Sequence, residues 1–181
     1  MKKRILSAIC CIAAMLLGTG LLKAQKPALQ ARATIASVED ETSQYEVFPL
    51  IMPDGSKQYY LSLGNVFVGD HKIGVDVPVA ELFVYLGTNL NETLSTMEEI
   101  KTWFQEPVDT EHHVGGRLAI AQPDGTLEEI EVETSKGLFG GKYLEFGVER
   151  SGADLYANIG KANFSSLVSG VKFYRKLHPK E

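Results

Sequence analysis

Two adjacent histidines and two nearby acids form the first group of residues in this sequence that could do chemistry. His112 and His113 follow closely after Asp109 and Glu111. Imidazole and carboxylate together can hold zinc or another divalent ion, so Asp109, His112 and His113 are candidate metal ligands. Adjacent side chains of a strand point to opposite faces, which disfavours one ion bound by both histidines. The alternative is a solvated polar loop, and we expect no resident cofactor.

Aromatic side chains form a second group that could bind a ligand. Tyr59, Tyr60, Trp103 and Tyr143 fall on or near expected strands. Exposed aromatic rings can stack on sugars or anchor a protein interface. Because Tyr59 and Tyr60 are neighbours in a strand, we expect one of them to face solvent. These four residues are the candidate surface for a ligand or partner, and ordinary packing in the core is the alternative.

Three patterns typical of enzymes are incomplete in this sequence. The glycine-rich stretch 137–142 fails as a phosphate-binding loop, because Lys136 stands where glycine is required and Tyr143 where serine or threonine is required. No serine lies in a Gly-x-Ser-x-Gly turn. The alternating glutamates of 129–133 fit the wet face of an antiparallel strand better than a catalytic pair. A hydrolase site assembled only in the fold stays open as an alternative.

The elements that would position these residues are mainly hairpins. Residues 45–51 and 58–64 flank the turn 52–55, in which proline fixes φ and glycine takes a positive φ. Pro49 cannot donate to a strand ladder, which predicts an edge or a bulge there. A weak strand is expected over 34–38.

Two further hairpins are predicted in the second half of the chain. Residues 117–132 repeat the first pattern around a Pro-Asp-Gly turn at 123–125, with Ile130 and Val132 facing inward. Residues 142–149 and 154–159 are expected to pair across Ser151 and Gly152.

Helical spacing occurs in two central segments. Residues 78–86 have apolar side chains at i, i+3, i+4 and i+7, which predicts a helix that Gly87 would end. The same β-branched and aromatic residues would also suit a buried strand. Ser95 and Glu98 have the spacing of a capping box, which predicts a helix over 95–104 that stops at Pro107. Residues 109–113 are then expected to form a polar connector.

A third helix is predicted near the end of the sequence. Phe164, Leu167, Val168 and Val171 lie on one helical face, with Asn163 as a candidate cap. Residues 173–177 either continue this helix or close a sheet edge.

Residues 1–24 have the order of a cleavable signal peptide. Basic residues at positions 2–4 precede an apolar stretch over 5–22, and Ala24 offers a small residue for cleavage before Gln25. We expect export to the periplasm or the outside of a Gram-negative bacterium, with no membrane insertion after cleavage. A permanent anchor is the alternative, because the stretch is near the lower length limit for spanning a bilayer.

The remaining residues, 25–181, are expected to form a single globular α+β domain. Both cysteines, Cys10 and Cys11, leave with the signal, so the domain has no disulfide and no thiolate nucleophile. The chain has 18 basic and 23 acidic residues, and removal of the four basic residues of the signal leaves 14 against 23, a net charge of −9. An acidic balance without a basic stripe argues against nucleic acid and an anionic lipid surface as partners.

The sequence therefore predicts an α+β fold, with a mainly antiparallel sheet of five to seven strands and two or three short helices. An all-β sandwich or barrel, with residues 78–86 as a strand, is the alternative. The expected function is a non-catalytic, exported cell-envelope domain that binds a protein or glycan partner. The alternatives are a hydrolase whose site assembles only in the fold and a structural envelope component.

Overall fold

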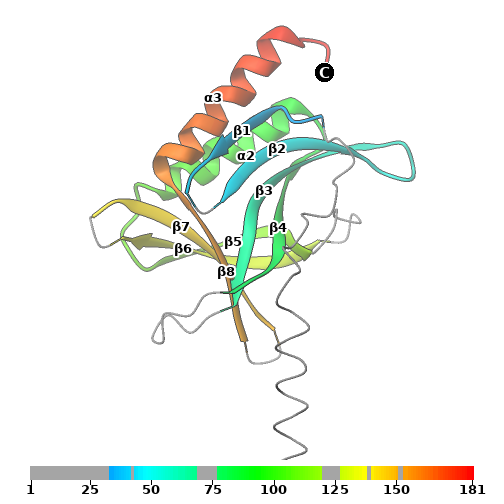
Figure 1. Cartoon of the computed structure of the whole chain (residues 1–181). Coiled ribbons are helices and arrows are strands. Elements are labelled where there is room, and N and C mark those ends of the chain that lie inside the picture. Colours follow the sequence, from blue (N-terminus) through cyan, green and yellow to red (C-terminus); the bar gives the residue numbers. More distant parts are fainter. Residues whose placement is uncertain (1–32, 42, 69–76, 120–126, 138–139, 151–152) are drawn as a thin grey trace, which may run out of the picture. The chain divides into compact units, whose positions relative to one another are not determined.

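The computed structural model describes residues 33–41, 43–68, 77–119, 127–137, 140–150 and 153–181 (Figure 1). The predicted signal peptide, the turn at 123–125 and the pair Ser151–Gly152 lie outside these residues. Eight antiparallel strands form one sheet, in which strands that follow each other in sequence also pair. The strands are β1 (Ala36–Glu39), β2 (Gln44–Ile51), β3 (Lys57–Val68), β4 (Val77–Gly87), β5 (Thr110–Ala119), β6 (Glu128–Lys136), β7 (Lys142–Arg150) and β8 (Ala153–Gly160).

Two helices in the described residues complete the fold. Helix α2 (Leu90–Trp103) connects β4 to β5, and helix α3 (Lys161–Leu177) follows β8. They contact each other, α3 packs on β1 and β2, and α2 packs on β4. Their buried side chains join those of the strands in one core. No helix in the described part of the chain is long and apolar enough to span a membrane.

The predicted strand pairings are confirmed, whereas of the three predicted turns only that at 52–55 lies in the described residues. Ile51 pairs with Lys57 across the first turn, where Gly55 has φ +83° and its amide donates to the Met52 carbonyl at 2.9 Å. Pro49 lies beyond the stretch of β2 that pairs with β1, so its missing donor faces an open edge. Strands β7 and β8 pair as predicted. Strand β5 pairs with β6 through residues 110–116, ahead of the predicted start at 117, and residues 117–119 pair with β4. The strand predicted near the start of the domain is β1.

The preferred prediction for residues 78–86 is wrong, because this segment is the central strand β4. Its alternate residues Leu82, Val84 and Leu86 face the main core. Phe83 is buried on the opposite face, in a second cluster with Phe48. A strand covered on both faces carries a continuous apolar run, which shows helical and strand spacing at once. The predicted helix stop, Gly87, instead ends the strand.

Helix α2 begins earlier than the sequence predicts. Asn89 is its N-cap, and the Asn89 side-chain oxygen accepts from the amides of Asn91 and Glu92 at 3.0 Å each. Ser95 therefore lies in the second turn, and Glu98 contacts Lys172 of α3 instead of capping. Residues 110–113, expected in a polar connector, are the first residues of β5.

Helix α3 confirms the predicted C-terminal helix, and residues 173–177 continue it. The predicted cap is wrong, because Gly160 is the N-cap and Asn163 lies inside the first turn. The Asn163 amide donates to Asp40 at 2.9 Å, which ties α3 to the turn between β1 and β2. A Cβ at Gly170 would lie 2.7 Å from Cβ of Ala36, so the helix and β1 approach closely there.

The sheet is open and dominates the fold. It curls until β8 meets β3, but only through the pairs Phe67–Tyr156 and Val68–Leu155. The α+β class therefore holds in outline, with eight strands in place of five to seven. The alternative of a sandwich or closed barrel is wrong, although its assignment of residues 78–86 to a strand is right.

Candidate functional site

A groove lies where β4 and β5 separate. Val84 and Gly116 form the last residue pair between these strands. Beyond this pair, Tyr85–Gly87 and His113–Gly115 face each other across a hollow of about 350 Å³, and α2 forms its third side. We call this hollow the α2 groove. Its full lining is Tyr85, Leu86, Gly87, Glu92, Thr96, Glu99, Ile100, Trp103, His113, Val114 and Gly115.

Two glycines allow the backbone geometry that forms the groove, one in β5 and one at the end of β4. A Cβ at Gly116 would lie 2.6 Å from Ile130 Cδ1 and 3.0 Å from the Phe83 carbonyl oxygen, so β5 approaches β4 closely there. Gly87 ends β4 with φ +141°, which lets the chain turn into α2 within two residues. Helix α2 then lines the hollow with residues of successive turns, from Glu92 to Trp103.

Both strands keep one edge without a strand partner along the groove. At Tyr85 and Gly87, β4 pairs with β3, and along 110–115, β5 pairs with β6. In the described residues no pairing crosses the groove between 85–87 and 113–115. Alternate residues of an antiparallel strand direct their amide and carbonyl groups to opposite edges. The groove is therefore flanked by main-chain donors and acceptors that no described strand pairs with.

Carboxylates and an aromatic ring supply the polarity of the groove. The Glu92 carboxylate accepts from the Thr88 amide at 2.8 Å and the Thr88 hydroxyl at 2.7 Å, and these bonds lower the pKa of Glu92. Burial, and then the nearby charge of Glu92, raises the pKa of Tyr85. At neutral pH the groove therefore presents an ionised carboxylate beside a protonated phenol, with Glu99 about two turns further along α2.

Trp103 is the last α2 residue that lines the groove, and its ring is partly covered. The indole stacks on His112 with ring centroids 4.4 Å apart and planes 6° apart, and it also packs against the core. Its carbonyl accepts from the buried Thr134 hydroxyl at 3.1 Å, which fixes the end of α2 on β6.

A second hollow of about 300 Å³ continues from the groove along β5 and β6. Its lining is His113, Val114, Gly115, Leu127, Glu128 and Glu129. His113 Nδ1 lies 3.5 Å from Glu129 Oε1, so the histidine stands between the two hollows. The acidic character of the α2 groove therefore extends across the neighbouring strand.

The structure does not bring the predicted metal ligands together. His112 covers Trp103, whereas His113 points toward Glu129, as expected for neighbours in a strand. Asp109 precedes β5 with φ +65° and lies near Glu133. Within the described ranges, no group of three or more histidine, cysteine or acidic residues is arranged to hold a metal ion.

Only one residue of the predicted aromatic surface lines the groove. Trp103 does, whereas Tyr143 is half-buried in β7 opposite Ser135. The expectation that Tyr59 or Tyr60 faces solvent is wrong, because their exposed fractions are 1% and 0%. Tyr59 lies in the main core, and Tyr60 lies on the other face of the sheet, stacked on Phe48.

The sequence reasoning missed Tyr85, Glu92, Thr96 and Glu99. A strand assignment for residues 78–86 would have placed Tyr85 opposite the core, and the spacing Asn89-x-x-Glu92 is a helix-start signal of the same kind as Ser95-x-x-Glu98.

Comparisons with known proteins give no match: no family model, no curated protein and no solved structure is similar to this chain.

Proposed function

We propose that this protein is a non-catalytic, exported domain of the cell envelope whose α2 groove binds an extended segment of a protein partner. One observation carries the proposal: pairing between β4 and β5 stops at Val84 and Gly116 although both strands continue. Extended peptides add to open sheet edges through main-chain hydrogen bonds, and pockets for alternate side chains give specificity.

The charge of the groove selects a basic segment. Glu92 and Glu99 lie on the α2 side, and Tyr85 lies on the β4 side, with its ring in edge contact with Tyr60. A lysine or arginine side chain can donate charge-assisted hydrogen bonds to carboxylates and lie over an aromatic ring. In an extended segment every second side chain lies on the same face, so a second basic residue can face Glu128 and Glu129.

A glycan in this groove is less well supported than a peptide. Sugar recognition by aromatic residues uses an open ring face. The imidazole of His112 already covers one face of Trp103, and the indole also packs against the core. Open strand edges, by contrast, present donors and acceptors at the spacing of a strand ladder, which a peptide repeats and a sugar ring does not.

Selection from a display library of random twelve-residue peptides tests the proposal. Trp103 is the only tryptophan in the chain, so its fluorescence reports binding of each selected peptide to the purified protein. We expect selected peptides to be rich in lysine and arginine. We also expect Thr96→Arg, which places a long cation in the groove, to weaken their binding by about tenfold or more.

Thr102→Arg is the matched control for this experiment. Thr102 lies on the same helix, is exposed and does not line the groove. It adds the same charge, so binding should match that of the unmodified protein. Selected peptides that bind Thr96→Arg as tightly as the unmodified protein would place their site elsewhere. Failure of the library to yield any binding peptide would contradict the proposal.

A further inference from the structure

The C-terminal end of α3 and the turn of the β2–β3 hairpin together expose apolar side chains. Among the described residues, Ile51, Phe173 and Leu177 are the most exposed large apolar residues, at 72%, 64% and 61%. Phe173 and Leu177 are four positions apart on α3 and therefore share a face of the helix. We call the region formed by Ile51, Lys57 and residues 172–181 the α3 end.

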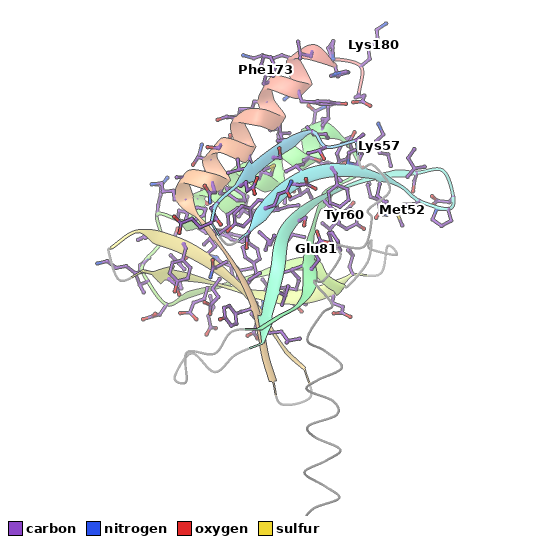
Figure 2. The ribbon with its side chains drawn as sticks, in the orientation of Figure 1. Met52, Lys57, Tyr60, Glu81, Phe173 and Lys180 are labelled. Atoms are coloured by element: carbon purple, nitrogen blue, oxygen red, sulfur yellow. The ribbon has the colours of Figure 1, made fainter. Side chains whose placement is uncertain are left out.

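Polar contacts hold these segments at one place. Lys57 pairs with Ile51 across the hairpin, and its ammonium lies 2.7 Å from Glu181 Oε1. The Tyr174 hydroxyl donates to Glu181 Oε2 at 2.8 Å, and the Tyr174 ring stacks on His178. Figure 2 shows Phe173 and Lys180 at the outer end of α3, and Lys57 at the start of β3 in the β2–β3 hairpin.

Positive charge is concentrated in the same region. Helix α3 has no acidic residue, and three of its four basic residues, Lys172, Arg175 and Lys176, lie in its last six positions. Lys172 contacts Glu98, and Lys57 contacts Glu181. In the parts of the chain that the structure describes, Arg175, Lys176 and Lys180 pair with no carboxylate. The α3 end is thus locally basic on an acidic chain.

This distribution changes the argument that net charge gave against an anionic lipid partner. Charges act over a Debye length of about 8 Å at physiological salt, so the residues next to a surface decide its attraction. Exposed phenylalanine and leucine side chains flanked by lysine and arginine are the pattern of segments that bind at a membrane interface. We propose that the α3 end binds the surface of a membrane containing anionic lipid. This inference is independent of the α2 groove.

Vesicle co-sedimentation tests the inference. The purified protein is mixed with phosphatidylcholine vesicles in which about one lipid in three is phosphatidylglycerol, which is anionic. A parallel sample uses vesicles of pure phosphatidylcholine. We expect binding to the anionic vesicles that weakens as salt is added. The double change Lys176→Glu and Lys180→Glu should weaken it by about tenfold or more, since each cation near an anionic surface contributes about fivefold.

Controls separate this surface from general charge and from hydrophobicity. Lys161→Glu changes the same type of exposed residue at the opposite end of α3 and should leave binding within about twofold. Phe173→Ser with Leu177→Ser should weaken vesicle binding by about tenfold or more, whereas Val108→Ser, at another exposed apolar site, should not. Circular dichroism confirms that each variant is folded.

Three results would overturn the inference. The first is equal binding to anionic and neutral vesicles, or none to either. The second is a vesicle affinity that the Phe173 and Leu177 changes leave unchanged, together with binding to soluble polyglutamate as strong as binding to the anionic vesicles. That result would indicate a site for acidic polymers. The third is self-association in sedimentation velocity that these changes abolish, which would make a second copy of the chain the occupant.

Discussion

Replacing Thr134 by valine should loosen the attachment of α2 that closes the groove. Thr134 is fully buried in β6, and its hydroxyl donates to the Trp103 carbonyl at 3.1 Å. Valine has nearly the same shape, so the change removes the hydrogen bond and leaves the packing. The Trp103 carbonyl keeps a second donor, the Glu106 amide at 3.1 Å. The loss in free energy of unfolding should therefore lie near the ordinary value for one hydrogen bond, about 1 kcal/mol.

Urea unfolding followed by Trp103 fluorescence measures this loss. With a denaturant slope of about 2 kcal/mol/M, the midpoint should fall by about 0.5 M. Thr102→Val is the matched control, because it removes an exposed hydroxyl that donates to the Glu99 carbonyl on the same helix. Its effect should stay below about 0.5 kcal/mol. An unchanged or higher midpoint for Thr134→Val would refute the view that this bond holds α2 on the sheet.

Three further substitutions test other parts of the fold. Gly170→Ala should lower the melting temperature, because the new methyl group meets Ala36 at a cost of about 1–3 kcal/mol that exceeds the gain in helix propensity; adding Ala36→Gly should restore it, and no rescue would contradict the close approach. Tyr45→Phe should lower the free energy of unfolding by about 1.5 kcal/mol, measured by chemical denaturation. The Tyr45 hydroxyl donates to the Asp40 carboxylate at 2.9 Å, and burial and Asp40 raise its pKa, which keeps it protonated. A loss under about 0.5 kcal/mol would count against this bond. Burial and neighbouring acids raise the pKa of Glu133 in the fold, so its ionisation costs stability as the pH rises through that pKa. Glu133→Gln should therefore raise the free energy of unfolding by about 0.5 kcal/mol at pH 7 and leave it unchanged near pH 3. An equal gain at both pH values would show that charge is not the cause.

Local chemistry made the hairpins predictable from sequence. The turn at 52–55 is determined by its own residues, since proline fixes φ and glycine adopts a positive φ, and these backbone angles reverse the chain. The alternation of Ile130 and Val132 with glutamates likewise reports one buried and one wet face, and the structure has that arrangement. Neither inference requires knowledge of a distant residue.

The misassigned segments depend on distant residues. Residues 78–86 look helical because both faces of β4 are buried, one by the main core and the other by Phe48 and Tyr60. The start of α2 was placed at Ser95 because that residue precedes a glutamate at capping distance, although Asn89 does so too. The end of β4 at Gly87 selects Asn89, and that end is set by the pairing with β3.

The groove itself could not be predicted from spacing. It exists because β4 and β5 separate beyond the Val84–Gly116 pair and α2 forms the third side of the hollow, which is a property of three elements together. Trp103 was singled out from the sequence for its residue type, but its stacking on His112 was not expected. The charge of the α3 end was missed because the net charge was taken over the whole chain.

Amide hydrogen exchange of the purified protein, with and without a peptide selected from the library, tests the central claim most directly. If the peptide adds to the open edges of β4 and β5, amides within 85–87 or 113–115 should gain main-chain hydrogen bonds and exchange more slowly. The amides of Tyr143 and Ser135, in the β6–β7 ladder, should not change. Protection confined to residues outside the groove, with 85–87 and 113–115 exchanging as in the free protein, would contradict the account.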